Sequence, residues 1–445
     1  MRKYKSVRIG EVCSVTKGET GLASAIPGKY PLVTTGANRK TSNSYQFDAE
    51  AVCIPLVSST GHGKKTLNYV HFEKGKFALG TILAAVIPKR PNEISAEYLY
   101  LYLQYYKDKK IVPLMQGAAN VSLSIKNIEK IEVDLPPINE QKVWLDIYRK
   151  FNVSFTYMQE ELSLQSASLK LLRQSILQDA IEGKLTVEWR KKNPVIKGDP
   201  ETDAAALLEK IKKEKQKLID EGKIKKAGIQ DSIIKNKVLI PNTWVYPLLY
   251  EITKQISDGT HQTPTYVKEG KIFLSAQNVK PFRFLPENHQ FVTQQAYDSY
   301  RINKIPELGD LLIARVGAGI GETAIINKKI DFAYYVSLCL VKVIKSITLP
   351  KYLAIVSNSP YGVNYAKGNV SSGGTSAGNY NLGRIRSFPI PLPPLAEQRA
   401  IVDRVDELLQ IVDELEKEAA ACKTLSENLM QALLKEAFEG GGEND

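Results

Sequence analysis

The sequence predicts two similar α+β domains separated by two long helices that form a coiled coil, with pseudo-two-fold symmetry. Three observations predict this arrangement: an internal repeat, a long apolar heptad after each copy of it, and basic charge confined to two separate blocks. The length of 445 residues and the hydrophobic content of 43% suffice for two or three domains, each with its own core.

The repeat is clearest around a pair of prolines. Residues 125–141 (IKNIEKIEVDLPPINEQ) align with residues 382–398 (LGRIRSFPIPLPPLAEQ) at an offset of 257, and the same offset aligns AIEG at 180–183 with AFEG at 437–440. A gap-free match over this distance indicates a duplication, because self-similarity at one fixed offset is the signature of repeated structural units.

A long helix is expected after each proline pair, over residues 138–184 and 395–439. Apolar residues recur there at alternating spacings of four and three, which is typical of a coiled-coil seam. Gly183 and Gly440 follow the helices where a C-capping glycine belongs. Each helix would be roughly 65 Å long at about 1.5 Å per residue. The expected seam residues are Trp144, Tyr148, Phe151, Phe155, Leu162, Leu169, Leu172, Ile176, Ile401, Val405, Leu408, Val412, Leu415, Leu429 and Leu433.

The globular domains are expected over residues 1–137 and 241–394, each with short strands bounded by glycine and proline and with one helix. Two weaker similarities support a shared strand framework: IGEV at 9–12 resembles LYEI at 249–252, and LGTIL at 79–83 resembles LGDLL at 308–312. Residues 185–240 stand outside the repeat and are lysine-rich, so they are expected to be an insertion or linker with a solvated helix, or else to contact phosphate directly. Residues 440–445 are expected to be a flexible tail.

The distribution of charge indicates a polyanionic partner. The net charge is +12, with 19 Lys and Arg against 11 Asp and Glu in residues 1–137 and 16 against 9 in residues 241–394. By contrast, residues 395–439 have 5 against 11, which favours a protein surface over a DNA surface. An alternative of another class is a coiled-coil assembly scaffold whose basic domains bind protein.

No catalytic centre, metal site or cofactor site is expected. The four cysteines form no CxxC pair and the four histidines have no metal-ligand spacing. The glycine-rich run RVGAGIG at 315–321 is expected to be a tight strand turn, because it lacks a βαβ context, and TGHGKKT at 60–66 does not have phosphate-loop spacing. Asp134 with Glu140 imitates a nuclease motif, but Glu140 opens a helix. An enzyme with an unrecognised fold is a further alternative. With no signal-peptide core and no long apolar run, a cytoplasmic protein is expected.

An α+β domain followed by LPPxxEQ and a long helix, occurring twice, resembles the specificity subunit of type I restriction–modification systems. The resemblance implies that each domain is a target recognition domain for one half of a bipartite, asymmetric DNA sequence. It also implies that the two long helices pack antiparallel and act as a ruler between the halves. It also implies two modification subunits, which methylate adenine N6, and ATP-driven restriction subunits. S-adenosylmethionine, ATP and magnesium would belong to those partners, and this chain would have no cofactor.

Polar loop residues of the two domains are then the candidates for DNA contact. Arginine and lysine suit guanine edges and phosphates, whereas asparagine and glutamine suit adenine. In the first domain the candidates are Asn38, Arg39, Lys40, His62, Lys64, Lys65 and Asn120. In the second they are Thr260, His261, Gln262, Thr263, Gln277, Asn278, Lys280, Arg283 and Arg315, with Ser372, Thr375 and Asn379 from the loop 371–379.

Overall fold

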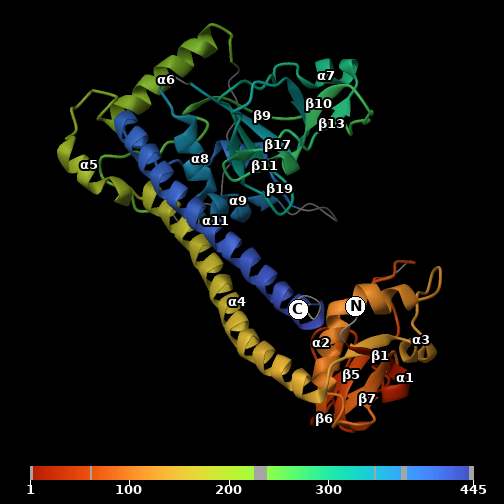
Figure 1. Cartoon of the computed structure of the whole chain (residues 1–445). Coiled ribbons are helices and arrows are strands. Elements are labelled where there is room, and N and C mark those ends of the chain that lie inside the picture. Colours follow the sequence, from red (N-terminus) through yellow and green to blue (C-terminus); the bar gives the residue numbers. More distant parts are fainter. Residues whose placement is uncertain (1–3, 61–62, 225–237, 345–346, 372–377, 440–445) are drawn as a thin grey trace. The chain divides into compact units, whose positions relative to one another are not determined.

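The computed structural model describes residues 4–60, 63–224, 238–344, 347–371 and 378–439 (Figure 1). The chain forms two compact units, one of residues 1–164 with 419–445 and the other of residues 165–418. Each unit holds one α+β domain with part of both long helices. The division therefore falls inside the helices rather than between a domain and its helix.

Unit 1 is built on a six-stranded sheet in the order β2-β7-β5-β6-β3-β4. Strand β5 (Phe47–Pro55) is buried on both faces, with Val52 and Ile54 in one apolar cluster and Ala51 and Cys53 in another. The strands are β1 Lys5–Arg8, β2 Cys13–Lys17, β3 Tyr30–Val33, β4 Lys40–Ser42, β5 Phe47–Pro55, β6 His71–Leu79, β7 Leu83–Pro88 and β8 Glu132–Leu135. The helices are α1 Ile9–Val12, α2 Ala96–Tyr106 and α3 Ile125–Glu129, with π and 3-10 turns at Lys107–Ile111 and Val112–Leu114.

Unit 2 has a four-stranded sheet in the order β15-β14-β17-β9, a three-stranded sheet in the order β13-β10-β16 and two small hairpins. The strands are β9 Thr253–Asp258, β10 Lys271–Leu274, β11 Val279–Lys280, β12 Arg283–Phe284, β13 Gln290–Val292, β14 Leu311–Ala314, β15 Thr323–Ile325, β16 Phe332–Tyr334, β17 Leu338–Val343, β18 Val370–Ser371 and β19 Asn379–Tyr380. The helices are α5 Val187–Lys192, α6 Ala204–Asp220, α7 Gln294–Tyr300, α8 Pro350–Asn358, α9 Pro360–Gly368 and α10 Leu382–Arg386, with 3-10 turns at Lys184–Thr186 and Ala276–Asn278.

The two domains share one strand framework. The order β2-β7-β5-β6 corresponds to β9-β17-β14-β15, and every neighbouring pair in both series is antiparallel. The expected equivalence of residues 79–83 and 308–312 is wrong, because the first segment leads into β7 and the second into β14, which is the counterpart of β5. In both segments a Leu-Gly-Xaa sequence leads through a turn into a buried strand. This short pattern does not tell which strand of the framework follows.

The long helices are α4 Ile138–Ile181 and α11 Leu395–Glu439, close to the expected bounds. Gly183 follows α4 with φ of 70°, as expected of a C-capping glycine, whereas Gly440 lies outside the described residues. The helices pack antiparallel within each unit. In unit 1, Gln159 Nε2 donates to Ser426 Oγ at 2.7 Å, and in unit 2, Arg173 Nη2 pairs with Asp413 and with Glu416.

The seam is more deeply buried in unit 2 than in unit 1, and it departs from the heptad in two places. Leu172 and Leu429 are exposed by 46% and 52%, so their expected places on the seam are wrong. An α-helix drifts about 20° per heptad relative to a strict 3.5-residue repeat, so the contact line moves to the neighbouring residues. Beside them, Arg173 is half-buried against α11 and Met430 is buried. Of the remaining expected residues, Leu169, Ile176, Ile401, Val405 and Val412 are buried, and Trp144, Tyr148, Phe151, Phe155, Leu162, Leu408, Leu415 and Leu433 are partly buried.

The described part of the segment 185–240 is not a solvated linker. Leu207 and Ile211 of α6 are fully buried in the core of unit 2. The first amides of α11, those of Leu395 and Ala396, donate to the carbonyls of Pro200 and Glu201 at 3.2 and 3.0 Å. The segment therefore covers the start of α11.

No helix in the described ranges is both long enough and apolar enough to cross a membrane.

Candidate nucleic-acid interface

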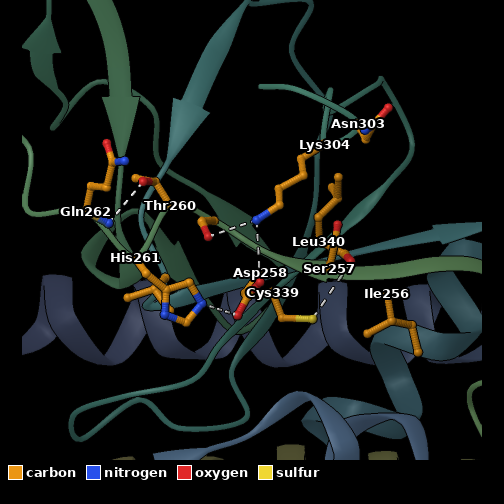
Figure 2. Close-up of polar contacts among 12 residues, drawn as sticks. Ile256, Ser257, Asp258, Thr260, His261, Gln262, Asn303, Lys304, Cys339 and Leu340 are labelled. Carbon is orange, nitrogen blue, oxygen red and sulfur yellow. Dashed lines mark hydrogen bonds and ion pairs between the residues drawn. The ribbon is translucent and has the colours of Figure 1, made fainter. Parts of the chain in front are cut away.

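Several loops of the second domain converge on the carboxylate of Asp258, at the end of β9 (Figure 2). His261 Nε2 lies 2.7 Å from Asp258 Oδ2, Arg315 Nη1 donates to the same oxygen at 3.1 Å, and Lys304 Nζ is 3.6 Å from Oδ1. Burial of Asp258 would raise its pKa, but the hydrogen bond from His261 and the positive charges of Arg315 and Lys304 hold that pKa below its ordinary value. The carboxylate is thus an ionised anchor for three basic side chains.

The candidates in this domain divide into exposed and structural side chains. His261, Gln262, Thr263, Gln277 and Arg283 are exposed and can reach a ligand.

Four other candidates support the loops instead. Asn278 is fully buried and donates to the carbonyls of Leu285 and Asn288, Arg315 is only 3% exposed, and Thr260 is buried beside β16. Lys280 is half-buried and pairs with Glu322. Polar residue type alone did not separate these from the exposed set.

Asn379 lies half-buried in β19 and pairs with Val316 across a β-bridge, so the end of the loop 371–379 lies beside the turn that follows β14. That turn has glycines with positive φ at Gly317 and Gly321, which agrees with the expected tight turn. Ser372 and Thr375 lie outside the described residues.

In the first domain, two loops with candidate residues meet. Gly63 N donates to Ala119 O at 3.3 Å, which brings the exposed Lys64 and Lys65 close to the loop that carries the exposed Asn120. Ser58 Oγ and Thr66 Oγ1 hold the lysine loop closed. His62 lies outside the described residues.

A third loop of this domain exposes Asn38 and Lys40, but it holds Arg39 in place. Arg39 pairs with Glu73 and lies 3.1 Å from His71 Nδ1. Burial of His71 and the positive charge of Arg39 lower the pKa of the imidazole to about 4, so it is neutral at physiological pH. Arg39 is therefore partly committed to the protein.

Asp258 and Lys304 were not among the expected site residues. The sequence contains a signal for this turn but not for the carboxylate: Gly259 and Thr260 follow β9 as Gly18 and Thr20 follow β2. Gly259 has no room for a side chain, since an added Cβ would lie 2.1 Å from Tyr334 O. Such a glycine fixes the loop against the sheet, and its neighbours are then held in fixed positions.

The Glu-Gln pair of each repeat joins a domain to its long helix. Gln141 and Gln398 are both fully buried, and each donates from Nε2 to the carbonyl of the residue five positions earlier, Pro136 at 2.8 Å and Pro393 at 3.0 Å. Each Oε1 accepts from the N-cap amide of the domain helix, Ser95 N at 2.9 Å before α2 and Leu349 N at 3.4 Å before α8. The motif is thus a structural joint, as the sequence indicates for Glu140.

The two glutamates beside these glutamines have different surroundings. Glu140 accepts one hydrogen bond, from Tyr4 Oη at 2.8 Å. Glu397 is 1% exposed on its side chain and accepts from Arg190, Thr186 Oγ1 at 2.7 Å and Trp244 Nε1 at 2.8 Å. The buried carboxylate therefore ties α11 to the segment that precedes the second domain. Among the described residues, no group of three or more His, Cys, Asp or Glu side chains is placed to hold a metal ion.

A family model described as the type I restriction modification DNA specificity domain matches residues 1–163 and 265–421. The chain belongs to this family. It is a DNA specificity subunit of a type I restriction–modification system, and such subunits are non-catalytic and have no cofactor of their own.

Relatives agree with this assignment over most of the chain. The EcoDI specificity subunit of Escherichia coli is 24% identical over 452 residues, covering 98% of this chain and 88% of the relative. The StySPI specificity subunit of Salmonella potsdam is 23% identical and covers 89% of this chain and 76% of the relative. A structure solved in work on complex assembly and conformational transition of the type I R-M system is 16% identical, covers 98% of both chains and has a TM-score of 0.58, which shows a shared fold.

Proposed function

We propose that this specificity subunit reads a bipartite, asymmetric DNA target, one half with the loops of each domain. The observation that carries this proposal is that both domains present exposed polar side chains from loops of one shared strand framework, Lys64, Lys65 and Asn120 in the first and His261 to Thr263 in the second. Because the loops differ in sequence, the two halves of the target differ.

A domain exchange tests this proposal in the assembled system. Residues 1–135 are replaced by the corresponding domain of a relative, and methylated sites are mapped in cells that express the variant with its modification subunits. One half of the methylated motif should change while the other half stays as in the wild type. A change in both halves, or in neither, would refute independent reading by the two domains.

The scaffold alternative is tested by salt. Six to ten phosphate contacts imply that affinity for target DNA falls by about 10³-fold or more between 50 and 200 mM salt. The basic domains provide the charge for such contacts, with 19 Lys and Arg against 11 Asp and Glu in residues 1–137. An affinity that is flat over this range, or no DNA binding with intact partner binding, would favour the scaffold.

We also propose that modification subunits cover the outer face of the long helices, and that restriction subunits join the complex through them. In unit 1, Val153, Tyr157 and Leu164 are 71%, 66% and 62% exposed, and their spacing puts them on one face of α4. A double variant Tyr157→Glu, Leu164→Glu should lose co-purification with the modification subunit, whereas Thr156→Glu, on an exposed side of the same turn, should retain it. Equal co-purification of both variants would refute this surface. Because the proposed target is chromosomal DNA, the proposed location of the chain is the cytoplasm.

We further propose that the helix pair sets the gap between the two halves of the target. Inserting four residues after Gln165 lengthens α4 by about 6 Å. The recognised half-sites should then stay the same while the gap widens by one or two base pairs. Unchanged spacing in the methylated motif of the insertion variant would rule out the ruler.

A further inference from the structure

Backbone hydrogen bonds show which residues of the two domains are equivalent, and at two of these positions the domains have different kinds of side chain. Leu56 N donates to Ile82 O at 2.8 Å and Arg315 N donates to Ser337 O at 2.8 Å. In turn, Leu56 O accepts from Leu123 N at 2.8 Å, and Arg315 O accepts from Tyr380 N at 2.9 Å, which are residues related by the repeat offset of 257. Arg315 therefore occupies the position that Leu56 occupies in the first domain.

The partner position differs in the same way. Lys17 pairs with Ala84 across β2 and β7, and Asp258 pairs with Cys339 across β9 and β17. The first domain thus has a buried leucine and an exposed lysine where the second has a buried arginine and its carboxylate partner. Because leucine suffices for the framework, and because burying an ion pair has a high desolvation cost, the pair in the second domain needs a reason other than stability.

Arg315 joins three separate segments of the second domain. Its Nε donates to Tyr380 O at 3.0 Å, and its Nη1 donates to Val336 O at 2.9 Å as well as to Asp258. These partners lie next to the loop 371–379, in the turn before β17 and at the start of the loop 259–266. One buried side chain therefore fixes the start of the loop 259–266 relative to Tyr380 and Val336.

Asp258, which Arg315 holds in place, in turn holds an exposed side chain. His261 is 69% exposed on its side chain, and its Nε2 points at Asp258, as Figure 2 shows. Lys304 braces the same turn through Gly259 O at 3.2 Å and the Asp258 carboxylate. A proton on Nε2 leaves Nδ1 as an acceptor in the neutral ring, and the amino groups of adenine and cytosine are the donors that DNA offers in the major groove.

We propose that His261 is a specificity-determining residue for the half-site read by the second domain, and that Asp258 and Arg315 are positioning residues that hold it. This inference rests on the proposed function, that each domain reads one half of the target.

The test uses the full chain assembled with its modification subunits and a DNA library randomised in both half-sites. His261→Ala should relax the preference at one or two adjacent base pairs of the second half-site, with an affinity loss of about 5- to 100-fold for the best site. The first half-site should be unchanged, so each molecule contains its own control. Glu269→Ala, an exposed change in the same loop region, should alter neither half.

Arg315→Leu gives the second domain the residue that the first domain has at this position. It should broaden the same base pairs as His261→Ala, and the double variant should be no worse than either single variant, because both act through one side chain. Arg315→Lys, which keeps the charge, should recover part of the preference. If Arg315→Leu does not fold, Asp258→Asn with His261→Ala provides the same comparison.

An unchanged second half-site in His261→Ala, or strictly additive losses in the double variant, would overturn the inference. Neither outcome would affect the proposed function, which fails only if the wild-type complex shows no half-site preference in the same library.

Discussion

The two domains use the same main-chain framework and differ in what fills it. The first has Leu56 and Lys17 where the second has Arg315 and Asp258, and the first has a half-exposed Glu140 where the second has a Glu397 that accepts three buried or half-buried donors. The contacts that are the same in both copies are made to backbone atoms, such as those of Gln141 and Gln398. The comparison indicates that backbone contacts preserve the duplicated fold while side-chain networks specialise each copy.

The largest expected difference between the copies concerns the two glutamates. Glu397→Ala removes the carboxylate partner of the half-buried Arg190 and leaves the buried Trp244 Nε1 without its acceptor, so it should lower the free energy of unfolding by about 3–5 kcal/mol. Glu140→Ala removes one half-exposed hydrogen bond and should lower it by about 1 kcal/mol or less. Denaturant unfolding of both variants measures this difference, and equal losses would show that the copies do not differ here.

The second prediction concerns the deeper seam of unit 2. Leu169→Ala, at a site that is 6% exposed, should cost about 2–5 kcal/mol, whereas Leu172→Ala, at 46% exposed, should cost about 0.5 kcal/mol. Thermal unfolding of the two variants would decide between the heptad register and the observed one. A larger loss of stability for Leu172→Ala than for Leu169→Ala would instead support the strict heptad register.

The third prediction concerns what the copies share. Gln141→Leu and Gln398→Leu each leave a half-buried N-cap amide and a buried carbonyl without the glutamine partner, so each should cost about 2–3 kcal/mol. Hydrogen exchange at the first turns of α2 and α8 should rise in the respective variant and only there. A large loss in one copy and none in the other would contradict the equivalence of the two joints.

The smallest expected effect on stability at neutral pH is that of substituting His71 in the first domain. Its pKa is about 4 in the folded chain and about 6.5 when unfolded, so the unfolded state binds more protons between these values. Stability should therefore fall as the pH decreases from 6.5 towards 4, by up to about 3 kcal/mol. His71→Gln should flatten this slope in urea unfolding measured between pH 7 and pH 4.5. An unchanged slope would mean that His71 does not contribute to it.

The long helices and the domain pair could be predicted because they depend on patterns that repeat along the chain. The register of the seam could not be predicted at Leu172 and Leu429, because a small angular drift accumulates over several turns and a heptad count does not include it. The insertion was misjudged for a similar reason. Exposed lysines dominate the composition of α6, while Leu207 and Ile211 on its buried side enter the core of unit 2.

The candidate site could be predicted as a set of loops but not residue by residue. Asn278 and Arg315 have the same chemistry as a DNA contact, and only the surrounding carbonyls and the Asp258 carboxylate show that they face inward. The partners of Arg315 are distant in sequence, because it lies 57 residues from Asp258 and 65 from Tyr380. Short-range patterns contain no record of such pairings.

The joint at each Leu-Pro-Pro segment has a consequence for how new specificities can arise. Gln141 and Gln398 bind the domain through a main-chain amide, the one at the N-cap of α2 or α8, and bond the carbonyl of a nearby proline. Because these hydrogen bonds are made to main-chain atoms, the joint does not depend on which side chains the domain has. Gene exchange that ends at this junction can therefore replace a whole domain while the long helices are inherited intact.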